Sequence, residues 1–237
     1  MHIIQDIYIY MQNITLITSV IDPPNNPLSY TACRSVFNKE QRFEQTKKTI
    51  LSIREKIPNN KILLIECSNL TSLEIKYFRE HVDFFVNIYD AGNVNLINRM
   101  FTKSKSMGEG TMTIVALQYI NDNHLIFDNL FKCSGRYWLN DKFDYEFYDN
   151  NISCVRKINN DPNNVFTCFY KLSRKLTGKW LSTLLSSESE SEFLRCTGYE
   201  VMFAKFINSS YEETIYSIPI KVGINGYVTV CGTYIDL

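Results

Sequence analysis

Residues 14–20 read I-T-L-I-T-S-V, a nearly continuous run of β-branched and apolar side chains. This pattern is typical of a strand that is buried on both faces of a sheet. Residues 61–67 (K-I-L-L-I-E-C) and 83–88 (D-F-F-V-N-I) repeat it further along the chain. The three runs predict neighbouring strands in the interior of an α/β domain, with helices on both faces of the sheet.

Two segments with helical periodicity separate these strands. Residues 39–57 carry an apolar stripe, and residues 71–82 open with Thr71 and Glu74, the pair that forms a capping box. The resulting order β-α-β-α-β predicts an α/β fold with a mostly parallel central sheet and right-handed crossovers. The long segment after the first strand begins with D-P-P-N-N-P and predicts a loop that serves a ligand.

The remainder of the chain is less regular. We expect a helix at 111–120, strands at 153–158 and 165–172, a helix at 192–207 and a hairpin turned by Asn225-Gly226. There is no internal repeat and no low-complexity linker, so the sequence favours a single domain over residues 1–237.

Composition limits the partners of this chain. Acidic and basic residues balance at 25 each, so no overall field would draw it to nucleic acid or to an anionic membrane. Seven cysteines are scattered singly, a spacing that fits neither a zinc site nor a disulfide framework and indicates reduced thiols in the cytoplasm. We expect no signal peptide and no transmembrane segment. Binding of an anion must therefore be local.

Residues 125–144 (L-I-F-D-N-L-F-K-C-S-G-R-Y-W-L-N-D-K-F-D) are the strongest candidate for such a site. An apolar strand delivers Lys132, Ser134, Gly135 and Arg136 together at its end. Arginine offers a rigid fork of donors, lysine a mobile charge, and glycine lets a backbone approach closely, which suits a phosphate-bearing ligand. The alternative is a strand-turn-strand corner with solvated charges.

A second candidate is Gly108-Glu109-Gly110, which precedes the helix expected at 111–120. Glycines at that place would leave the first N–H groups of the helix open to an anion. The carboxylate of Glu109 would repel a phosphate, so we expect it to accept hydrogen bonds from sugar hydroxyls or an amine. Ordinary helix capping is the alternative.

Several motifs resemble those of one enzyme family. They are T-S-V-I (18–21), R-S-V-F (34–37), R-F-E-Q-T (42–46), L-L-I-E-C-S (63–68), G-E-G (108–110) and F-K-C-S-G-R-Y-W-L-N-D (131–141). Together they look like GT-A glycosyltransferases, in particular the glycosyltransferase-like proteins of large DNA viruses and bacterial polysaccharide loci. The resemblance implies a Rossmann-like GT-A domain with a nucleotide-binding half (14–120) and an acceptor and catalytic half (121–237). It also implies transfer of a sugar from a nucleotide-sugar donor to a carbohydrate or glycoconjugate acceptor. A catalytically inactive module that binds a nucleotide or glycan is the alternative.

The resemblance also implies roles for individual residues. Glu200, at the late helix, would be the base toward the acceptor hydroxyl, and Lys132 and Arg136 would neutralise the departing nucleotide. The implied donor-binding residues are Thr18, Ser19, Val20, Arg34, Glu66, Gly108, Glu109, Gly110, Ser134, Gly135 and Tyr137. A nucleotide sugar would be the co-substrate.

The usual metal-binding D-x-D of the family is missing at the expected strand end, where Lys132 and Arg136 stand instead. We therefore favour neutralisation without a metal. Asp141, Asp144 and Glu146 lie further on and are the alternative ligands for Mn²⁺ or Mg²⁺. A methyltransferase that uses S-adenosylmethionine is a third hypothesis, but the first strand lacks the glycine-rich turn such an enzyme needs.

Overall fold

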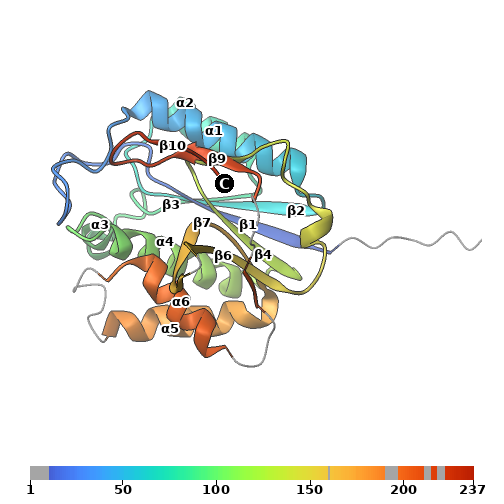
Figure 1. Cartoon of the computed structure of the whole chain (residues 1–237). Coiled ribbons are helices and arrows are strands. Elements are labelled where there is room, and N and C mark those ends of the chain that lie inside the picture. Colours follow the sequence, from blue (N-terminus) through green and yellow to red (C-terminus); the bar gives the residue numbers. More distant parts are fainter. Residues whose placement is uncertain (1–10, 160, 190–196, 211–214, 218–221) are drawn as a thin grey trace, which may run out of the picture.

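The computed structural model describes residues 11–159, 161–189, 197–210, 215–217 and 222–237 (Figure 1). The strands are β1 (Asn13–Ser19), β2 (Asn60–Glu66), β3 (Phe84–Asn87), β4 (Asn129–Ser134), β5 (Tyr137–Leu139), β6 (Ser153–Ile158), β7 (Asp161–Ser173), β8 (Ile215–Ser217), β9 (Ile224–Tyr227) and β10 (Tyr234–Asp236). In these residues a seven-stranded sheet has the order β3-β2-β1-β4-β7-β6-β8, and a three-stranded sheet has the order β10-β9-β5. Only β7 runs against the other strands of the large sheet. The predicted α/β fold with a mostly parallel central sheet is thus confirmed.

Helices cover both faces of the large sheet. They are α1 (Lys39–Lys56), α2 (Ser72–His81), α3 (Val94–Met100), α4 (Lys105–Asp122), α5 (Arg174–Ser189) and α6 (Tyr199–Ser209), with a short 3₁₀ turn at Glu146–Tyr148. Figure 1 shows α1, α2 and the small sheet on one side and α3 to α6 on the other. The predicted helices at 39–57 and 71–82 are confirmed as α1 and α2, including the capping box of Thr71 and Glu74.

The strand order produces a topological switch at β1. The chain moves outward from β1 to β2 and β3, then returns through α4 to place β4 on the other side of β1. The helices that follow β1 and precede β4 therefore lie on opposite faces of the sheet (Figure 1). Their divergence opens a crevice beyond the carboxyl ends of β1 and β4, where ligands bind in open α/β sheets.

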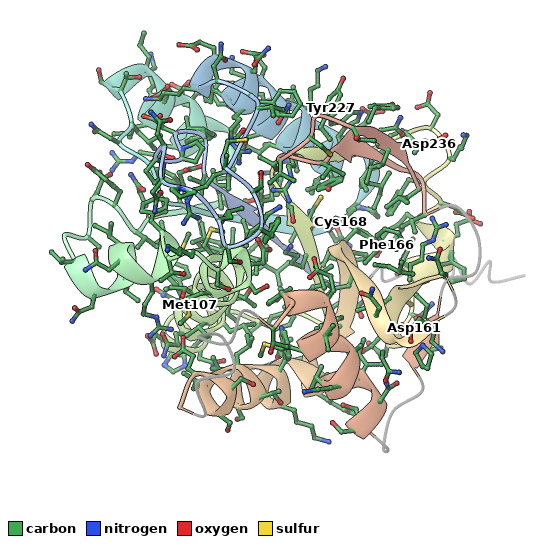
Figure 2. The ribbon with its side chains drawn as sticks, turned by 60° about the vertical axis from the view of Figure 1, so that its left-hand side comes forward. Met107, Asp161, Phe166, Cys168, Tyr227 and Asp236 are labelled. Carbon is green, nitrogen blue, oxygen red and sulfur yellow. The ribbon has the colours of Figure 1, made fainter. Side chains whose placement is uncertain are left out.

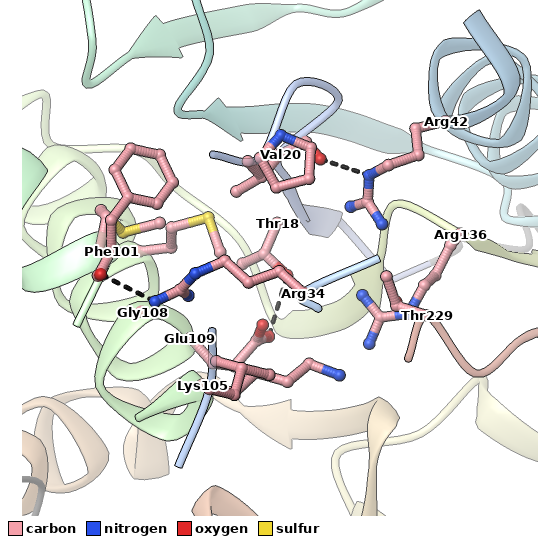
Figure 3. Close-up of a pocket in the computed structure, with 14 residues that line it drawn as sticks. Thr18, Val20, Arg34, Arg42, Phe101, Lys105, Gly108, Glu109, Arg136 and Thr229 are labelled. Atoms are coloured by element: carbon pink, nitrogen blue, oxygen red, sulfur yellow. Dashed lines mark hydrogen bonds between the residues drawn. The ribbon is translucent and has the colours of Figure 1, made fainter. Parts of the chain in front are cut away.

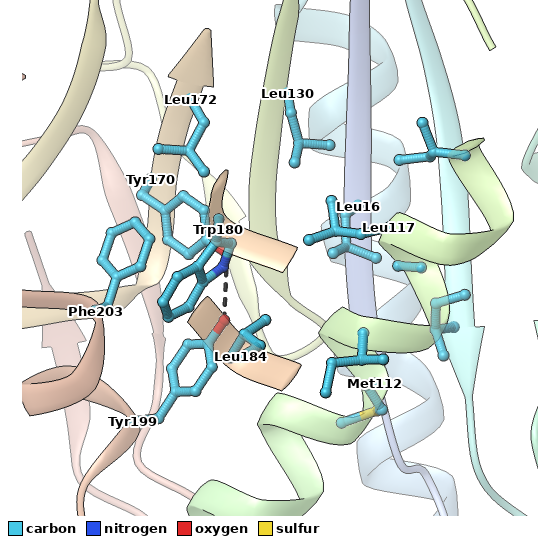
Figure 4. Packing of buried hydrophobic residues seen from close by; sticks show 14 of the residues in the cluster. Leu16, Met112, Leu117, Leu130, Tyr170, Leu172, Trp180, Leu184, Tyr199 and Phe203 are labelled. Atoms are coloured by element: carbon cyan, nitrogen blue, oxygen red, sulfur yellow. Dashed lines mark hydrogen bonds between the residues drawn. The ribbon is translucent and has the colours of Figure 1, made fainter. Parts of the chain in front are cut away.

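Alternation along the strands divides the core into two clusters. Leu16 on β1 packs with α4, α5 and α6, whereas its neighbour Ile17 packs with α1 and α2 because successive side chains of a strand point to opposite faces. In the first cluster Trp180 of α5 is fully buried, and Tyr170 of β7 stacks on Phe203 of α6 with ring centroids 4.2 Å apart (Figure 4). These large rings fix α5 and α6 against the antiparallel part of the sheet.

The helix expected at 111–120 is longer than the sequence predicts, because Ser104 caps its start by accepting a hydrogen bond from Met107 N. Gly108, Glu109 and Gly110 therefore lie inside α4 instead of preceding it. The prediction of an anion site at the N–H groups of a helix that begins after these glycines is wrong, because the helix begins at Lys105. Gly108 has a packing role: a Cβ there would lie 2.8 Å from the carbonyl oxygen of Met100 in α3. The sequence also missed α3 itself.

Three other expectations differ from the structure. Asn225 and Gly226 lie within β9 instead of turning a hairpin, and a Cβ on Gly226 would lie 2.2 Å from Cδ1 of Tyr137, so this glycine allows the two strands to approach. Strand β7 already begins at Asp161. Helix α6 begins at Tyr199, and residues 192–196 of the helix expected at 192–207 lie outside the described residues.

The described part of the chain contains no helix that is both long and apolar enough to cross a bilayer. Its cysteines are free thiols: Cys33, Cys67, Cys133, Cys154, Cys168 and Cys231.

Candidate functional site

Two adjoining cavities open at the switch point, beyond the carboxyl ends of β1 and β4. The inner cavity has a volume of about 70 Å³ and the outer cavity about 450 Å³. Lys105, Glu109 and Arg136 line both. The loop after β1 lines the inner cavity on one side, and Phe101 (labelled in Figure 3) and Met112 line it from the α3–α4 side.

Three basic side chains from separate parts of the chain converge on the inner cavity. Arg42 comes from the first turn of α1, Lys105 is the first residue of α4, and Arg136 lies in the turn between β4 and β5. Figure 3 shows their charged ends turned toward one another. We call Arg42, Lys105 and Arg136 the cation cluster.

Several donors at this place lack a protein partner. Among the described residues, Arg42 Nη1, Arg136 Nε and the hydroxyl of Thr229 are buried without a hydrogen bond, and all three residues line the inner cavity. Buried donors are nearly always satisfied in folded proteins, and three cations repel one another unless an anion lies between them. The arrangement has the donor set and charge of an anion-binding site.

The charge of Lys105 depends on its neighbours. The positive charge of Arg136, together with burial, lowers the pKa of Lys105 to about 7, although Glu109 and Glu200 act in the opposite direction. Burial also lowers the pKa of Arg42, whose ordinary value is so high that the guanidinium stays charged. Lys105 is therefore the member of the cluster that titrates near neutral pH.

Lys132 lies behind the wall of the cavity, fully buried. Its ammonium forms an ion pair with Glu109 and donates to Ser134 Oγ (2.7 Å) and to the carbonyl of Thr167 (2.8 Å). Glu109 also accepts from the hydroxyl of Thr18 (2.9 Å). Burial alone would raise the pKa of Glu109, and the Lys132 ammonium more than reverses this effect. The ion pair joins α4, β1, β4 and β7 beneath the site, and Lys132 has no hydrogen left for a ligand.

Glu200 faces the outer cavity from the second residue of α6. Tyr199 N donates to Ser106 Oγ (2.9 Å), which ties the start of α6 to the start of α4. Glu200 Oε1 accepts a long hydrogen bond of 3.4 Å from the hydroxyl of Thr167. The carboxylate thus lies in the lining of the outer cavity together with Lys105 and Arg136 of the cation cluster.

The structure brings most of the predicted residues to the two cavities. The inner cavity receives Thr18, Val20, Arg34, Gly108, Glu109 and Arg136, and the outer cavity Glu109, Ser134, Arg136, Tyr137 and Glu200. Arg34, however, is directed to the carbonyl groups of Phe101 and Thr102 and to Asn26 (Figure 3). It fastens the loop after β1 and turns its charge away from the cation cluster.

Five predicted residues line neither cavity: the buried Lys132, and Ser19, Glu66, Gly110 and Gly135. Ser19 and Glu66 are register partners, so both point to the α1 face, whereas Thr18 points to the α4 face. Glu66 is fully buried and accepts from Ile21 N, Cys67 N and the hydroxyl of Ser68. It shapes the loop after β1 and does not face the ligand, contrary to expectation.

Gly135 serves packing instead of approach to a ligand. A Cβ there would lie 2.9 Å from Ser19 Cβ and 3.2 Å from the carbonyl oxygen of Thr18. Its own N–H donates to that carbonyl (2.8 Å), and its carbonyl accepts from Thr46 Oγ1 (2.9 Å). This close contact is what holds Arg136 at the end of β1.

Sequence reasoning did not select Arg42 and Lys105 of the cation cluster, nor Tyr30, which lines the outer cavity. Arg42 stands in the R-F-E-Q-T motif at the start of a helix that follows a long loop, which is a usable signal. Lys105 lies in a segment that reads as irregular, and its position depends on where α4 begins. Tyr30 is one of several tyrosines in polar segments and has no distinguishing pattern.

The alternative metal ligands lie at the other end of the sheet. Asp141 pairs with Lys56, the last residue of α1, and Tyr145 accepts a hydrogen bond from Asn13, the first residue of β1. The length of β1, about 20 Å, separates this segment from the cavities. Within the described residues, no three His, Cys, Asp or Glu side chains are placed to hold a metal ion together.

Comparison with known proteins gives a likeness of fold. No model of a known protein family matches the chain, and no curated protein matches it in sequence. Its structure is similar to the apo form of the glycosyltransferase GlyE of Streptococcus pneumoniae TIGR4, with a TM-score of 0.50 and 8% identity over 87% of this chain and 45% of that chain. This chain has a glycosyltransferase fold. A second GlyE structure gives a TM-score of 0.47 at 10% identity, over 88% of this chain and 45% of that one.

The chain therefore spans about half the length of these glycosyltransferases (45% of each). The resemblance to proteins of large DNA viruses and bacterial polysaccharide loci rests on the sequence motifs alone.

Proposed function

We propose that this chain transfers a sugar from a nucleotide-sugar donor to a hydroxyl of a glycan or glycoconjugate. Three buried donors without partners carry the proposal, namely Arg42 Nη1, Arg136 Nε and Thr229 Oγ1. Their residues line a cavity at the switch point of a glycosyltransferase fold, where a diphosphate that enters with a small shift of these side chains would satisfy the donors and separate the charges of the cation cluster.

The inner cavity, the outer cavity and a third cavity together offer room for the nucleoside, the diphosphate and the sugar of the donor. A third cavity of about 310 Å³ shares Pro23 and Phe101 with the inner cavity and is lined by Asp22, Ser68, Asn69 and Tyr89. Hydroxyl, amide and carboxylate groups of this kind suit a nucleoside. The diphosphate would lie at the cation cluster, and the sugar would extend into the outer cavity toward Glu200.

In the proposed reaction the bond between the anomeric carbon and the diphosphate oxygen breaks, and a bond from that carbon to the acceptor oxygen forms. Glu200 takes the proton of the acceptor hydroxyl. The negative charge that develops on the leaving diphosphate is stabilised by Lys105 and Arg136, which are fixed in a partly buried site before the reaction begins.

The described residues at the cavities offer too few ligands for a divalent cation. Among them Glu109 is held by Lys132 and Thr18, which leaves the carboxylate of Glu200 in the lining of the two cavities. Hard cations need several oxygen ligands. We infer that the cation cluster supplies the neutralisation that a metal supplies in other glycosyltransferases.

A thermal-shift screen tests the proposal with UDP-, GDP-, CMP- and dTDP-sugars, each with EDTA or with manganese. A ligand at a hundredfold excess over its Kd stabilises the native state by about 2.7 kcal/mol. We expect one donor class to raise Tm in EDTA and to be consumed when glycans are added. Absence of any shift would overturn the proposed function, and binding without consumption would favour an inactive binding module.

Donor affinity should fall as pH rises above about 7. The empty protein loses the Lys105 proton there, whereas a bound diphosphate favours the charged form, so the complex holds more protons than the empty protein. Affinity then decreases by up to about tenfold per pH unit and is level below pH 7. Calorimetry with a nucleotide sugar, whose esterified diphosphate does not titrate near neutral pH, would measure this.

The matched variants for this pH dependence are Lys105→Met and Lys103→Met. Lys105→Met should bind weakly at every pH with a level profile, and the exposed neighbour Lys103→Met should keep the wild-type slope. A Lys105→Met profile as steep as that of the wild type would assign the titration to another group.

A further inference from the structure

One residue in the lining of the outer cavity, Tyr30, has no role in the proposed binding of the donor. Tyr30, in the loop after β1, is 63% exposed although its ring is large and partly apolar. It lines the same cavity as Glu200. Partial burial and the charge of Glu200 raise the pKa of the Tyr30 hydroxyl, whose ordinary value already keeps it a hydrogen-bond donor at neutral pH.

Hydrogen bonds within the loop hold Tyr30 in this exposed position. Ser29 N donates to the carbonyl of Lys103 (2.9 Å), and Leu28 N donates to the carbonyl of Thr31 (3.0 Å). Arg34 fastens the other side of the loop through the carbonyl of Phe101 (2.7 Å). The loop is therefore hydrogen-bonded on both sides of Tyr30. These bonds hold the exposed ring in the cavity lining, where a ligand can contact it.

The lining of this cavity combines apolar side chains with several hydroxyl groups and the carboxylate of Glu200. Ile158, Phe166 and Ile235 contribute apolar surface, and Glu200 and Thr167 lie at the α6 end. Figure 2 shows Phe166 and Cys168 on β7, between the small sheet with Tyr227 and Asp236 and the helices on the other face. Among the described residues, the cations in this lining are Lys105 and Arg136, which also line the inner cavity.

We propose that Tyr30 forms the acceptor subsite, in which an uncharged pyranose ring stacks on the tyrosine and presents a hydroxyl to Glu200. The inference rests on the proposed function and adds the chemical class of the acceptor. The C–H face of a pyranose matches an aromatic face, and its hydroxyls match Thr167 and the Tyr30 hydroxyl. A carboxylated or phosphorylated acceptor would meet the charge of Glu200, and the described lining adds no cation beyond Lys105 and Arg136, which the donor diphosphate would occupy.

The test compares Tyr30→Ala, Tyr30→Phe and wild type with neutral methyl hexopyranosides, methyl glucuronide and glycerol phosphate as acceptors. Transfer to water and donor-induced Tm shifts are followed in parallel. We expect Tyr30→Ala to raise the KM for neutral glycosides about tenfold, with donor binding and hydrolysis within twofold of wild type. Tyr30→Phe should stay within about threefold in KM, because stacking remains. Acidic acceptors should be poorer than neutral ones in the wild type.

Tyr234→Ala is the matched control, since Tyr234 is also exposed (49%) and lines none of the three cavities. If Tyr30→Ala keeps the wild-type acceptor KM, or if acidic acceptors are preferred, the acceptor assignment is wrong while the proposed function stands. If the wild type binds no nucleotide sugar, the proposed function is wrong, and the acceptor subsite that rests on it is wrong as well.

Discussion

Arg136→Ala should weaken donor binding about 100-fold or more and leave the protein folded. Arg136 lies where the two cavities meet, and its buried Nε has no partner in the described structure. A hydrogen bond to a charged group contributes about 1.5–3 kcal/mol, so two lost bonds amount to about 3 kcal/mol or more. Since 1.4 kcal/mol is tenfold in Kd, the expected loss is about two orders of magnitude.

Folding should survive because the repulsion of Arg136 from Lys105 and Arg42 in the empty site offsets part of its attraction to Tyr137 and Glu109, which raises the pKa of Arg136. Its removal also relieves the effect that lowers the pKa of Lys105, so this pKa should rise toward its ordinary value. Calorimetric Kd and Tm values for Arg136→Ala, Arg136→Lys and the exposed control Arg79→Ala would measure both effects. Binding of the alanine variant within threefold of wild type would remove Arg136 from the donor site.

Lys132→Met should cost about 3–5 kcal/mol of the free energy of unfolding, the usual consequence of leaving one charge of a buried pair alone. The Lys132 side chain is 0% exposed and that of Glu109 is 16% exposed. Replacing both residues, as in Lys132→Met/Glu109→Leu, should recover much of the loss, because no unpaired charge then remains in the core. Urea unfolding of the two single variants and the double variant would measure the coupling.

Lys76 and Glu80 provide the matched control. They form an exposed pair on α2 with N–O distance 3.8 Å, and Lys76→Met should change stability by less than about 1 kcal/mol. If Lys132→Met costs no more than Lys76→Met, the buried pair does not hold the four elements beneath the site. In that case Lys132 would be free for the catalytic role that the sequence resemblance implies.

Local sequence patterns were sufficient for the parallel half of the fold. The runs at 14–20, 61–67 and 83–88 became β1, β2 and β3 within a residue or two. Continuous apolar runs, a capping box and proline-rich loops act over a few residues, so they can be recognised in one sequence. For the same reason Arg136 and Gly135 were placed together correctly at the end of a strand.

The tertiary structure decided which of these side chains face the ligand. The two-residue period of β1 and β2 turned Ser19 and Glu66 to the α1 face, and the start of α4 at Lys105 moved Gly108 and Gly110 into the helix. The cation cluster joins α1, α4 and the β4–β5 turn, and it exists only because the chain returns to β4 across β1. The sequence by itself therefore determined the first three strands, α1, α2 and the presence of a basic strand end. Long-range packing determined that Lys132 is an internal ion-pair partner, and that Arg42 and Lys105 are the cations beside Arg136.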